Sequence, residues 1–350
     1  MATSSYTIAA NDEHGQNPPT AGKRTPVMPY LNVSIYENQF NRPTKNRLLE
    51  ACLRCGYNVY DVKPEITDTP ISTRVARVNR RRPTILVTYG YNAFGSGSTF
   101  NSARGITTFY SSRNPYATQS RALAEDLYEQ LVMGTTQPGR GVENLFDVGM
   151  LGSVNCRSVL VEPGFMTNLS EAKLMIDPDY QTEVAEESCK GICVYLGENY
   201  LPRGDLSVYP TLRVGSRGNF VLLLQFILND YGYNIASDGI FGSGTSAAVK
   251  RFQQANGLTA DGIVGRNTWR TLLVLAPRPT IRRGDRNVYV TYLQQKLTSK
   301  LYPLGTPDGI FGARTQTAVI EFQSENGLVA DGIVGANTWA RIEKIGGGRT

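Results

Sequence analysis

The sequence predicts a layered α/β domain with a mostly parallel sheet, followed by two small three-helix domains. Apolar strand-like runs alternate with amphipathic helical patterns as far as residue 196. Alternation of this kind is typical of folds in which helices cover a largely parallel sheet. The rest of the chain holds one segment that is written twice. These two observations divide the chain into a larger front domain and a duplicated C-terminal region.

The duplicated segment returns at a fixed offset. The string Asp238-Gly239-Ile240-Phe241-Gly242 reappears at 308–312, and Trp269 reappears as Trp339, in both cases 70 residues later. A fixed period with its landmark residues in phase indicates a duplicated module. Each copy is long enough to hold a core of its own, so we expect two tandem beads rather than a solenoid.

Each bead is expected to contain three helices. In the first bead, Val221, Leu224 and Leu228 lie on one face of a helix. A second helix opens near Gly244, and a short third one contains Trp269. The Asp-Gly pairs punctuate the chain between helices, where glycine adopts positive φ and aspartate bonds to its own backbone. The second bead repeats this pattern.

The front domain is expected to alternate strands and helices along its length. Short runs rich in β-branched and aromatic residues predict strands at Tyr6–Ala10, Asn32–Tyr36, Asn58–Val62, Thr84–Tyr89, Gly105–Tyr110 and Val159–Glu162. Apolar residues at helical spacing predict helices at Gln39–Cys55, Gln119–Met133, Ser170–Met175 and Asp179–Leu196.

Composition shifts set the expected domain boundaries. The front domain is assigned to residues 1–197, and the glycine- and proline-containing stretch 198–217 is interpreted as a linker. The beads are assigned to residues 218–275 and 284–346, with Ala276-Pro277-Arg278-Pro279 between them.

The chain is mildly basic, with a formal net charge of +6 and a pI near 9.0. This balance favours a partner rich in phosphate or carboxylate groups. The longest basic run is Arg80-Arg81-Arg82 and no nucleic-acid-binding motif is visible, so we do not expect a nucleic acid partner. The first residues lack a basic segment followed by a long apolar run, so we expect neither a signal peptide nor insertion into a membrane.

Five cysteines occur, all of them in the front domain. An odd count in a large domain favours free thiols over a disulfide framework. Cys52 and Cys55 have the spacing of a redox or metal motif, but they fall on a predicted helix with no second pair nearby in the sequence. We therefore interpret them as small buried residues.

The beads resemble the type 1 peptidoglycan-binding domain, a three-helix module of bacterial wall hydrolases. The recurring Asp-Gly-Ile strings, the Phe-Gln pairs and the tryptophans carry this resemblance over nearly the whole of each bead. It implies that bacterial peptidoglycan is the partner of this region.

The front domain resembles the zinc-dependent N-acetylmuramoyl-L-alanine amidases of the amidase type 3 family. His14-Gly15 follows a strand, as the first zinc-binding His-Gly does in that family, and Glu37 stands just before the first long helix, where the family places a carboxylate ligand. The stretch 105–110 matches a later strand, and 161–168 matches the closing signature that contains the catalytic glutamate. The resemblance spans roughly residues 7 to 197.

The resemblance implies a zinc cofactor held by His14 and Glu37, with Glu162 as the catalytic residue. It also implies that Asn92 and Asn168 bind substrate. In such a site, zinc polarises the amide carbonyl between muramic acid and L-alanine, and a carboxylate moves the proton from water to the leaving amine.

One position departs from the family pattern. The second zinc-binding histidine belongs to a Ser-x-His-x-Asn-Ala string, and here the histidine position is Gly90. No other histidine can take its place, because His14 is the only one in the chain. Tyr89, Tyr91 or Asp12 are possible substitutes, although a strand points both tyrosines away from the face of Gly90.

Two interpretations follow. The chain is either an endolysin-like amidase that cuts peptidoglycan, or a catalytically degenerate wall-binding protein of a phage particle or spore that keeps the amidase domain as a scaffold. In either case we expect synthesis in the cytoplasm and action at the bacterial wall after release by phage lysis, within a phage particle or at sporulation.

Overall fold

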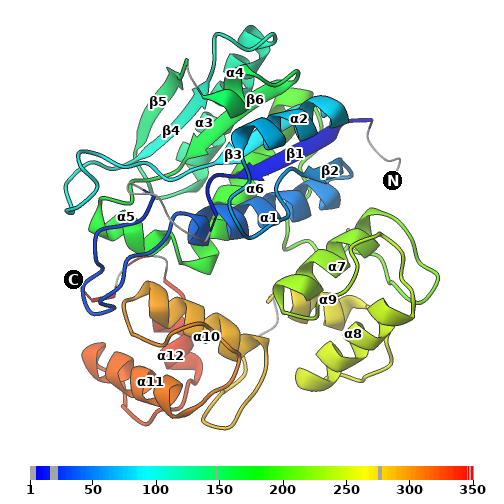
Figure 1. Ribbon diagram of the computed structural model, residues 1–350. Coiled ribbons are helices and arrows are strands. Elements are labelled where there is room, and N and C mark those ends of the chain that lie inside the picture. Colours follow the sequence, from blue (N-terminus) through cyan, green and yellow to red (C-terminus); the bar gives the residue numbers. More distant parts are fainter. Residues whose placement is uncertain are drawn as a thin grey trace. The chain divides into compact units, whose positions relative to one another are not determined.

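The computed structural model describes residues 5–15, 23–146, 148–274, 278–344, 346 and 348–349. The chain forms two compact units, Met1–Tyr200 and Leu201–Thr350, and each is described by itself (Figure 1). The first unit contains a mixed sheet, and the regular elements of the second, within its described residues, are helices. The residues predicted to separate the beads at 276–277 lie outside the described part of the chain.

The first unit is built on a six-stranded sheet with the order β2-β1-β3-β6-β4-β5. Its strands are β1 (Thr7–Asp12), β2 (Asn58–Asp61), β3 (Ile85–Tyr89), β4 (Ile106–Tyr110), β5 (Gly139–Asn144) and β6 (Arg157–Glu162). All neighbouring strands are parallel except β4 and β6, which are antiparallel. The predicted mostly parallel sheet is therefore confirmed.

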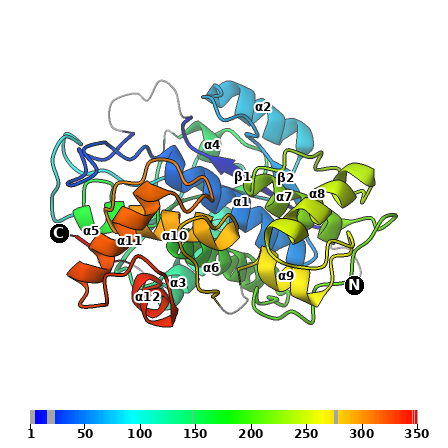
Figure 2. The same cartoon turned by 90° about the horizontal axis from the view of Figure 1, so that it is seen from below.

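Helices cover both faces of this sheet. They are α1 (Asn38–Arg54), α2 (Ile71–Arg81), α3 (Ala117–Gly134), α4 (Gly149–Gly152), α5 (Leu169–Leu174) and α6 (Pro178–Leu196). Helix α6 packs against both α1 and α3, which pack on the strands, and α2 packs with α4. Figures 1 and 2 show α2 on the opposite side of β1 from α1 and α6.

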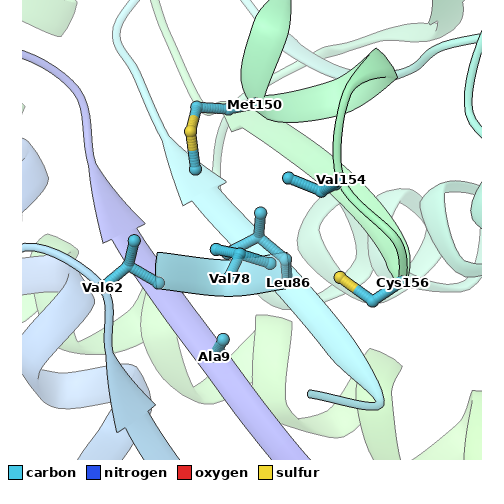
Figure 3. Close-up of a cluster of buried hydrophobic side chains, with 7 residues drawn as sticks. All are labelled: Ala9, Val62, Val78, Leu86, Met150, Val154 and Cys156. Atoms are coloured by element: carbon cyan, nitrogen blue, oxygen red, sulfur yellow. The ribbon is translucent and has the colours of Figure 1, made fainter. Parts of the chain in front are cut away.

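The core on the α2 side follows from strand alternation. Ala9 and Leu86 point to this face, whereas their neighbours along the strands point to the α1 side. They meet Val78 of α2 and Met150 of α4, and Val62, Val154 and Cys156 complete the cluster (Figure 3). A small cluster of buried side chains therefore covers the α2 side of the sheet.

Three elements of the first unit escaped the sequence analysis, and one expected strand is absent. Helix α2 carries four arginines and buries mainly Arg74 and Val78, so its apolar signal is weak. Strand β5 lies at the sheet edge and is largely exposed. The short helix α4 has only four residues. The segment 32–36 is not a strand, because it makes only one isolated bridge, between Arg24 and Tyr36.

Each bead is a three-helix unit, as predicted. The first contains α7 (Asn219–Asp230), α8 (Ser243–Ala255) and α9 (Arg266–Leu272). The second contains α10 (Val288–Ser299), α11 (Ala313–Glu325) and α12 (Ala336–Ile342). No helix in the described part of the chain is long and apolar enough to span a bilayer.

A buried glutamine explains the repeated Asp-Gly strings. Gln253 donates to the Asp261 carboxylate at 2.9 Å, to Ile263 O at 2.9 Å and to Thr268 Oγ1 at 3.3 Å. Its own oxygen accepts from Gly262 N at 2.9 Å, where φ is +78°. The side chain therefore clamps the turn in one conformation.

The same clamp occurs four times in the second unit. Equivalent glutamines brace the turns that begin at Asp238, Asp308 and Asp331, and these glutamines are Gln225, Gln294 and Gln323. Each clamped string reads Asp-Gly-Ile-Phe/Val-Gly, followed three residues later by threonine. Each bead is therefore itself built from two turns of one design, and these aspartates and glycines belong to the scaffold.

Part of the predicted linker belongs to the first bead. Tyr209 is buried, with its ring centroid 5.0 Å from that of Trp269. Trp269 Nε1 donates to Pro210 O at 2.8 Å, and Leu212 pairs with Val264. The glycine and proline content that indicated a linker therefore describes a packed segment from residue 209 onward.

We expect Gln253→Ala to lower the free energy of unfolding of the first bead by about 2–3 kcal/mol, because it leaves several buried polar groups unpaired. Urea unfolding followed by Trp269 fluorescence, in a Trp339→Phe background, measures this. The exposed neighbour Gln254 is the control, and Gln254→Ala should change the free energy by less than about 0.5 kcal/mol. Equal effects of the two changes would contradict the clamp.

Limited trypsin digestion of the folded chain should cut first after Arg203. Residues 201–208 are half-buried or exposed, whereas Tyr200 contacts Glu186 on one side and Tyr209 is buried on the other. Few groups hold this stretch, so it is the natural site of nicking. Mass spectrometry of the first fragments checks the position, and initial cleavage between residues 84 and 110 would contradict the boundary.

Candidate functional site

Three neighbouring parallel strands end at one edge of the sheet. In register, Asp12 of β1 lies beside Tyr89 of β3, which lies beside Val161 of β6. The ladder continues for one more residue, because Glu13 N donates to Tyr89 O and Gly90 N donates to Val161 O, each at 3.1 Å. Glu13, Gly90 and Glu162 therefore stand side by side in one row across the three strand ends.

Gly90 leaves a space that two carboxylates border. A Cβ atom on Gly90 would lie 3.1 Å from Glu13 Oε2 and 3.4 Å from Glu162 Oε1. The backbone of Gly90 is not in the left-handed region, so the glycine is not required by its own φ. The position where a histidine was expected is thus flanked by Glu13 on one side and Glu162 on the other.

His14 turns into the same region directly after β1. Its Nε2 lies 3.9 Å from Glu13 Oε2 and 3.7 Å from Glu37 Oε2. Its backbone has φ +59°, and its carbonyl accepts from Asn38 Nδ2 at 2.9 Å and from Lys63 Nζ at 3.0 Å. These donors hold the peptide in the conformation that aims the imidazole at the two carboxylates.

Gly15 is required by a close backbone approach. A Cβ there would lie 2.2 Å from the amide nitrogen of Asp68, closer than any side chain can be placed. This contact gives a physical reason for the His-Gly pair.

Glu37 is fixed through one of its two oxygens. Oε1 accepts from Tyr91 N at 2.8 Å and from Asn41 Nδ2 at 3.0 Å, and Oε2 faces His14. Asn41 Nδ2 also donates to Glu13 O at 3.1 Å. One amide on α1 therefore positions both segments that carry the neighbouring carboxylates, as outer-shell partners of metal ligands commonly do.

The electrostatics of this cluster favour a cation. Burial raises the pKa of Glu13 and of Glu37, and Glu13 adds to the rise at Glu37. Burial and then the Glu13 charge raise the pKa of Glu162 to about 8. Burial, with Lys23 nearby, lowers the pKa of His14 to about 4, so the imidazole is neutral at pH 7 and able to donate a lone pair.

The donor set fits a zinc ion. One oxygen from each of Glu13 and Glu37 and one nitrogen from His14 all lie within 4.8 Å of one another. Tetrahedral zinc with nitrogen and oxygen ligands needs donors about 3.3 Å apart, so the imidazole must approach each carboxylate by about half an ångström, and the two carboxylates must draw together, to complete the site. The side chains of His14 and Glu13 keep 23% and 21% exposure, which leaves access from solvent.

The three substitutes suggested from the sequence are placed elsewhere. Asp12 is fully buried and pairs with Lys45 at 2.8 Å and with Lys63 at 2.9 Å. Tyr91 donates its hydroxyl to Glu171 O at 2.9 Å. Tyr89 is buried on the α6 side, where it interacts electrostatically with Cys189 and Glu186. These side chains are buried with other partners, so the suggestion that one of them replaces the missing histidine as a zinc ligand is wrong.

Asn92 and Asn168 lie on two loops that the backbone joins. Asn92 N donates to Gly164 O at 2.8 Å, and Met166 N donates to Asn92 O at 2.7 Å. The Asn168 side chain caps α5 by accepting from Ser170 N and Glu171 N. Asn168 thus has a structural task that the sequence did not reveal.

Glu13 is the site residue that sequence reasoning missed. It stands beside His14, but its importance depends on the register that places it across from Gly90. A one-residue shift in that pairing would send it to the other face of the sheet. The signal available in the sequence was the position of Glu13. It is an acid directly after a buried strand, and that strand pairs with the one that leads to Gly90.

The chain is similar to known wall amidases over parts of its length. It is 37% identical over 118 residues to N-acetylmuramoyl-L-alanine amidase CwlM of Mycobacterium tuberculosis, covering 31% of this chain and 28% of that protein. It is 29% identical over 163 residues to N-acetylmuramoyl-L-alanine amidase CwlL of Bacillus licheniformis, covering 38% of this chain and 45% of that protein. The match therefore spans less than half of either relative.

A solved structure of an N-acetylmuramoyl-L-alanine amidase from Clostridium difficile is also similar. It shares 26% identity, covers 55% of this chain and 97% of its own, and has a TM-score of 0.48.

Two family profiles match the chain. The peptidoglycan binding domain matches twice, at residues 217–272 and 286–342. The N-acetylmuramoyl-L-alanine amidase profile matches residues 14–194, which is more than half of the chain. This range includes β3 and β6, which carry Gly90 and Glu162 at their ends. The chain therefore belongs to the N-acetylmuramoyl-L-alanine amidase family and carries two peptidoglycan-binding domains.

Proposed function

We propose that the first unit hydrolyses the amide bond between muramic acid and L-alanine in peptidoglycan, using zinc held by His14, Glu37 and Glu13. The observation that carries this proposal is the convergence of these three side chains beside Glu162 at one edge of the sheet. Glu13 supplies the third ligand, which replaces the histidine missing at Gly90.

Bound zinc would polarise the scissile carbonyl and make a water molecule more acidic at neutral pH. The protein supplies the rest. Asn41 and the backbone of Tyr91 hold one oxygen of Glu37, so its other oxygen stays aimed at the centre of the site. Lys63 and Asn38 hold the His14 peptide. This support fixes the ligands before substrate arrives, which lowers the cost of reaching the reactive geometry.

Glu162 is the proposed general base. Its carboxylate borders the same space as Glu13 and stands at the end of β6, half-buried. In the proposed reaction the charge of bound zinc would lower the raised pKa of Glu162, so that its ionised carboxylate takes a proton from the attacking water and gives that proton to the departing nitrogen of L-alanine. Asn92, on the loop joined to residues 164–166, is proposed to orient the substrate.

The two beads are proposed to hold the chain on the wall. Both retain their full set of clamped turns, and the positive net charge attracts anionic wall polymers over a distance. Tethering would raise the local concentration of substrate at the first unit. In this proposal the protein is endolysin-like and reaches the wall after release from the cytoplasm by lysis. The route is tested by comparing wall lysis when the purified protein is added outside the cells with wall lysis when the protein is made inside them.

Gly90 supports a second candidate, a wall-binding protein without turnover. If Glu13 serves only as a partner for the buried Arg74, whose charge acts on it, then the site lacks a third ligand. Release of new L-alanine amino termini from purified peptidoglycan separates the two candidates. An amidase creates them, and a scaffold binds peptidoglycan without creating any.

A residue exchange tests the role of Glu13. Glu13→Gln should lose about one zinc equivalent relative to the unchanged chain and reduce hydrolysis by about 100-fold or more. Gly90→His alone should require the Glu13 carboxylate to move by a few tenths of an ångström, because its Cβ would lie 3.1 Å from Glu13 Oε2. The double change Glu13→Gly and Gly90→His should recover zinc with His14 and Glu37. Elemental analysis and amine release provide the two readouts.

Glu129→Gln is the control, because Glu129 is exposed on α3 and outside the site. It should leave zinc content and hydrolysis unchanged. Zinc content that is the same in the unchanged chain and in Glu13→Gln would remove Glu13 from the ligand set. A folded double variant that gains no zinc would argue against the position assigned to Gly90.

The full chain should pellet with insoluble peptidoglycan, and a fragment of residues 1–200 should pellet much less. Binding through shaped surfaces should persist at about 1 M salt, where charges are screened beyond about 3 Å. Quantifying protein in the pellet at low and high salt checks this. Loss of all binding at high salt would reduce the role of the beads to non-specific attraction.

A further inference from the structure

Four of the five cysteines meet where the first long helix contacts the last helix of the first unit. Cys52 and Cys55 lie three residues apart at the end of α1, and Cys189 and Cys193 lie four residues apart in α6. Residues at these spacings share one face of a helix. Helices α1 and α6 pack together, so the two faces meet.

Three of the four sulfur atoms form a mutual cluster, and the fourth neighbours one of them. The Sγ atoms of Cys55, Cys189 and Cys193 all lie within 4.8 Å of one another, and that of Cys189 is 3.8 Å from that of Cys55. The thiol of Cys52 also interacts with that of Cys189. Tyr57 donates its hydroxyl to Cys193 Sγ at 3.4 Å, so the sulfur of Cys193 already serves as an acceptor.

We propose that Cys55, Cys189, Cys193 and Cys52 bind one zinc ion, at a metal site separate from the one that contains His14. Zinc bound by four thiolates has Zn–S distances of about 2.3 Å, which places neighbouring sulfurs about 3.8 Å apart. The observed Cys55 to Cys189 separation has this value. A disulfide needs sulfurs about 2.05 Å apart and would employ only two of the four thiols.

The two sites lie at opposite ends of one helix. Helix α1 is preceded by Glu37, which faces His14, and it ends at Arg54, just before Cys55. At 1.5 Å per residue, the path from Glu37 to Cys52 covers about 22 Å along the helix axis. No donor of the first cluster can therefore reach the second.

Binding requires no redox partner. Each coordinating thiol loses its proton to water as its sulfur forms a bond to zinc, and zinc keeps its oxidation state. The zinc ion then crosslinks the end of α1 to α6. Because this site does not exist in the unfolded chain, the binding free energy adds to the stability of the first unit.

The fifth cysteine distinguishes this site from thiol packing in general. Cys156 is buried in the cluster on the α2 side of the sheet, with Ala9 and Leu86. Like Cys52, Cys189 and Cys193 it is buried, but its described cluster contains no other sulfur of a cysteine, so it provides a matched control.

The test is titration of the full chain, reduced and stripped of metal, with cobalt(II) as a spectroscopic substitute for zinc. We expect one equivalent to produce a sulfur-to-cobalt charge-transfer band in the near ultraviolet, and one equivalent of zinc to abolish it. Cys55→Ser and Cys189→Ser should bind cobalt more weakly and give a smaller band, and Cys156→Ser should leave the band unchanged. His14→Ala should also keep it, because the other site offers no sulfur.

Circular dichroism establishes that each variant is folded. Cys55 is only half-buried at the end of α1, so Cys55→Ser decides the question if Cys189→Ser does not fold. A folded, reduced chain that shows no charge-transfer band at saturating cobalt overturns the proposal. So does loss of the band in Cys156→Ser, or a disulfide between Cys55 and Cys189 detected by mass spectrometry after purification without reductant.

Discussion

The buried Asp12 carboxylate is the interaction on which the candidate site depends. Its two oxygens pair with Lys45 and Lys63, and both lysine side chains have no exposure to solvent. Lys45 belongs to α1 and Lys63 follows β2, so one carboxylate ties three segments together. Removing one partner from such a buried pair costs about 3–5 kcal/mol, because the remaining charge stays unsolvated. Lys63 also bonds to the carbonyl of His14, so the same ion pairs set the direction of the imidazole.

The sheet register determines which residues lie beside one another once Asp12 is fixed. With Asp12 fixed beside Tyr89, the next residue of each strand must share a face, and these residues are Glu13, Gly90 and Glu162. A side chain at Gly90 would press on the carboxylate of Glu13. The absent side chain and the added carboxylate therefore share one space, and a side chain at Gly90 would require the Glu13 carboxylate to shift.

Much of the fold was readable because its signals are local. The predicted helix Gln39–Cys55 differs from α1 by one residue at each end, since its apolar face is continuous. The segment 32–36 has strand-like composition but no partner strand, and composition alone does not reveal pairing. The roles of Glu13 and of the cysteine cluster were unreadable for the same reason. Sheet register places Glu13 beside Gly90, and helix packing unites Cys55 with Cys189 across 134 residues of sequence.

Helix α1 connects these non-local features. Its first turn carries Asn38 and Asn41, which hold the His14 peptide, the Glu13 carbonyl and the Glu37 carboxylate. Its last turn carries Cys52 and leads into Cys55. A helix held at one end by ion pairs and amides and, in the proposed cysteine site, at the other by thiolates on zinc would have little freedom to slide or rotate. Because ligand geometry tolerates displacements of only about 0.5 Å, rigidity at the distant end of α1 also contributes to the precision of the site at its first turn.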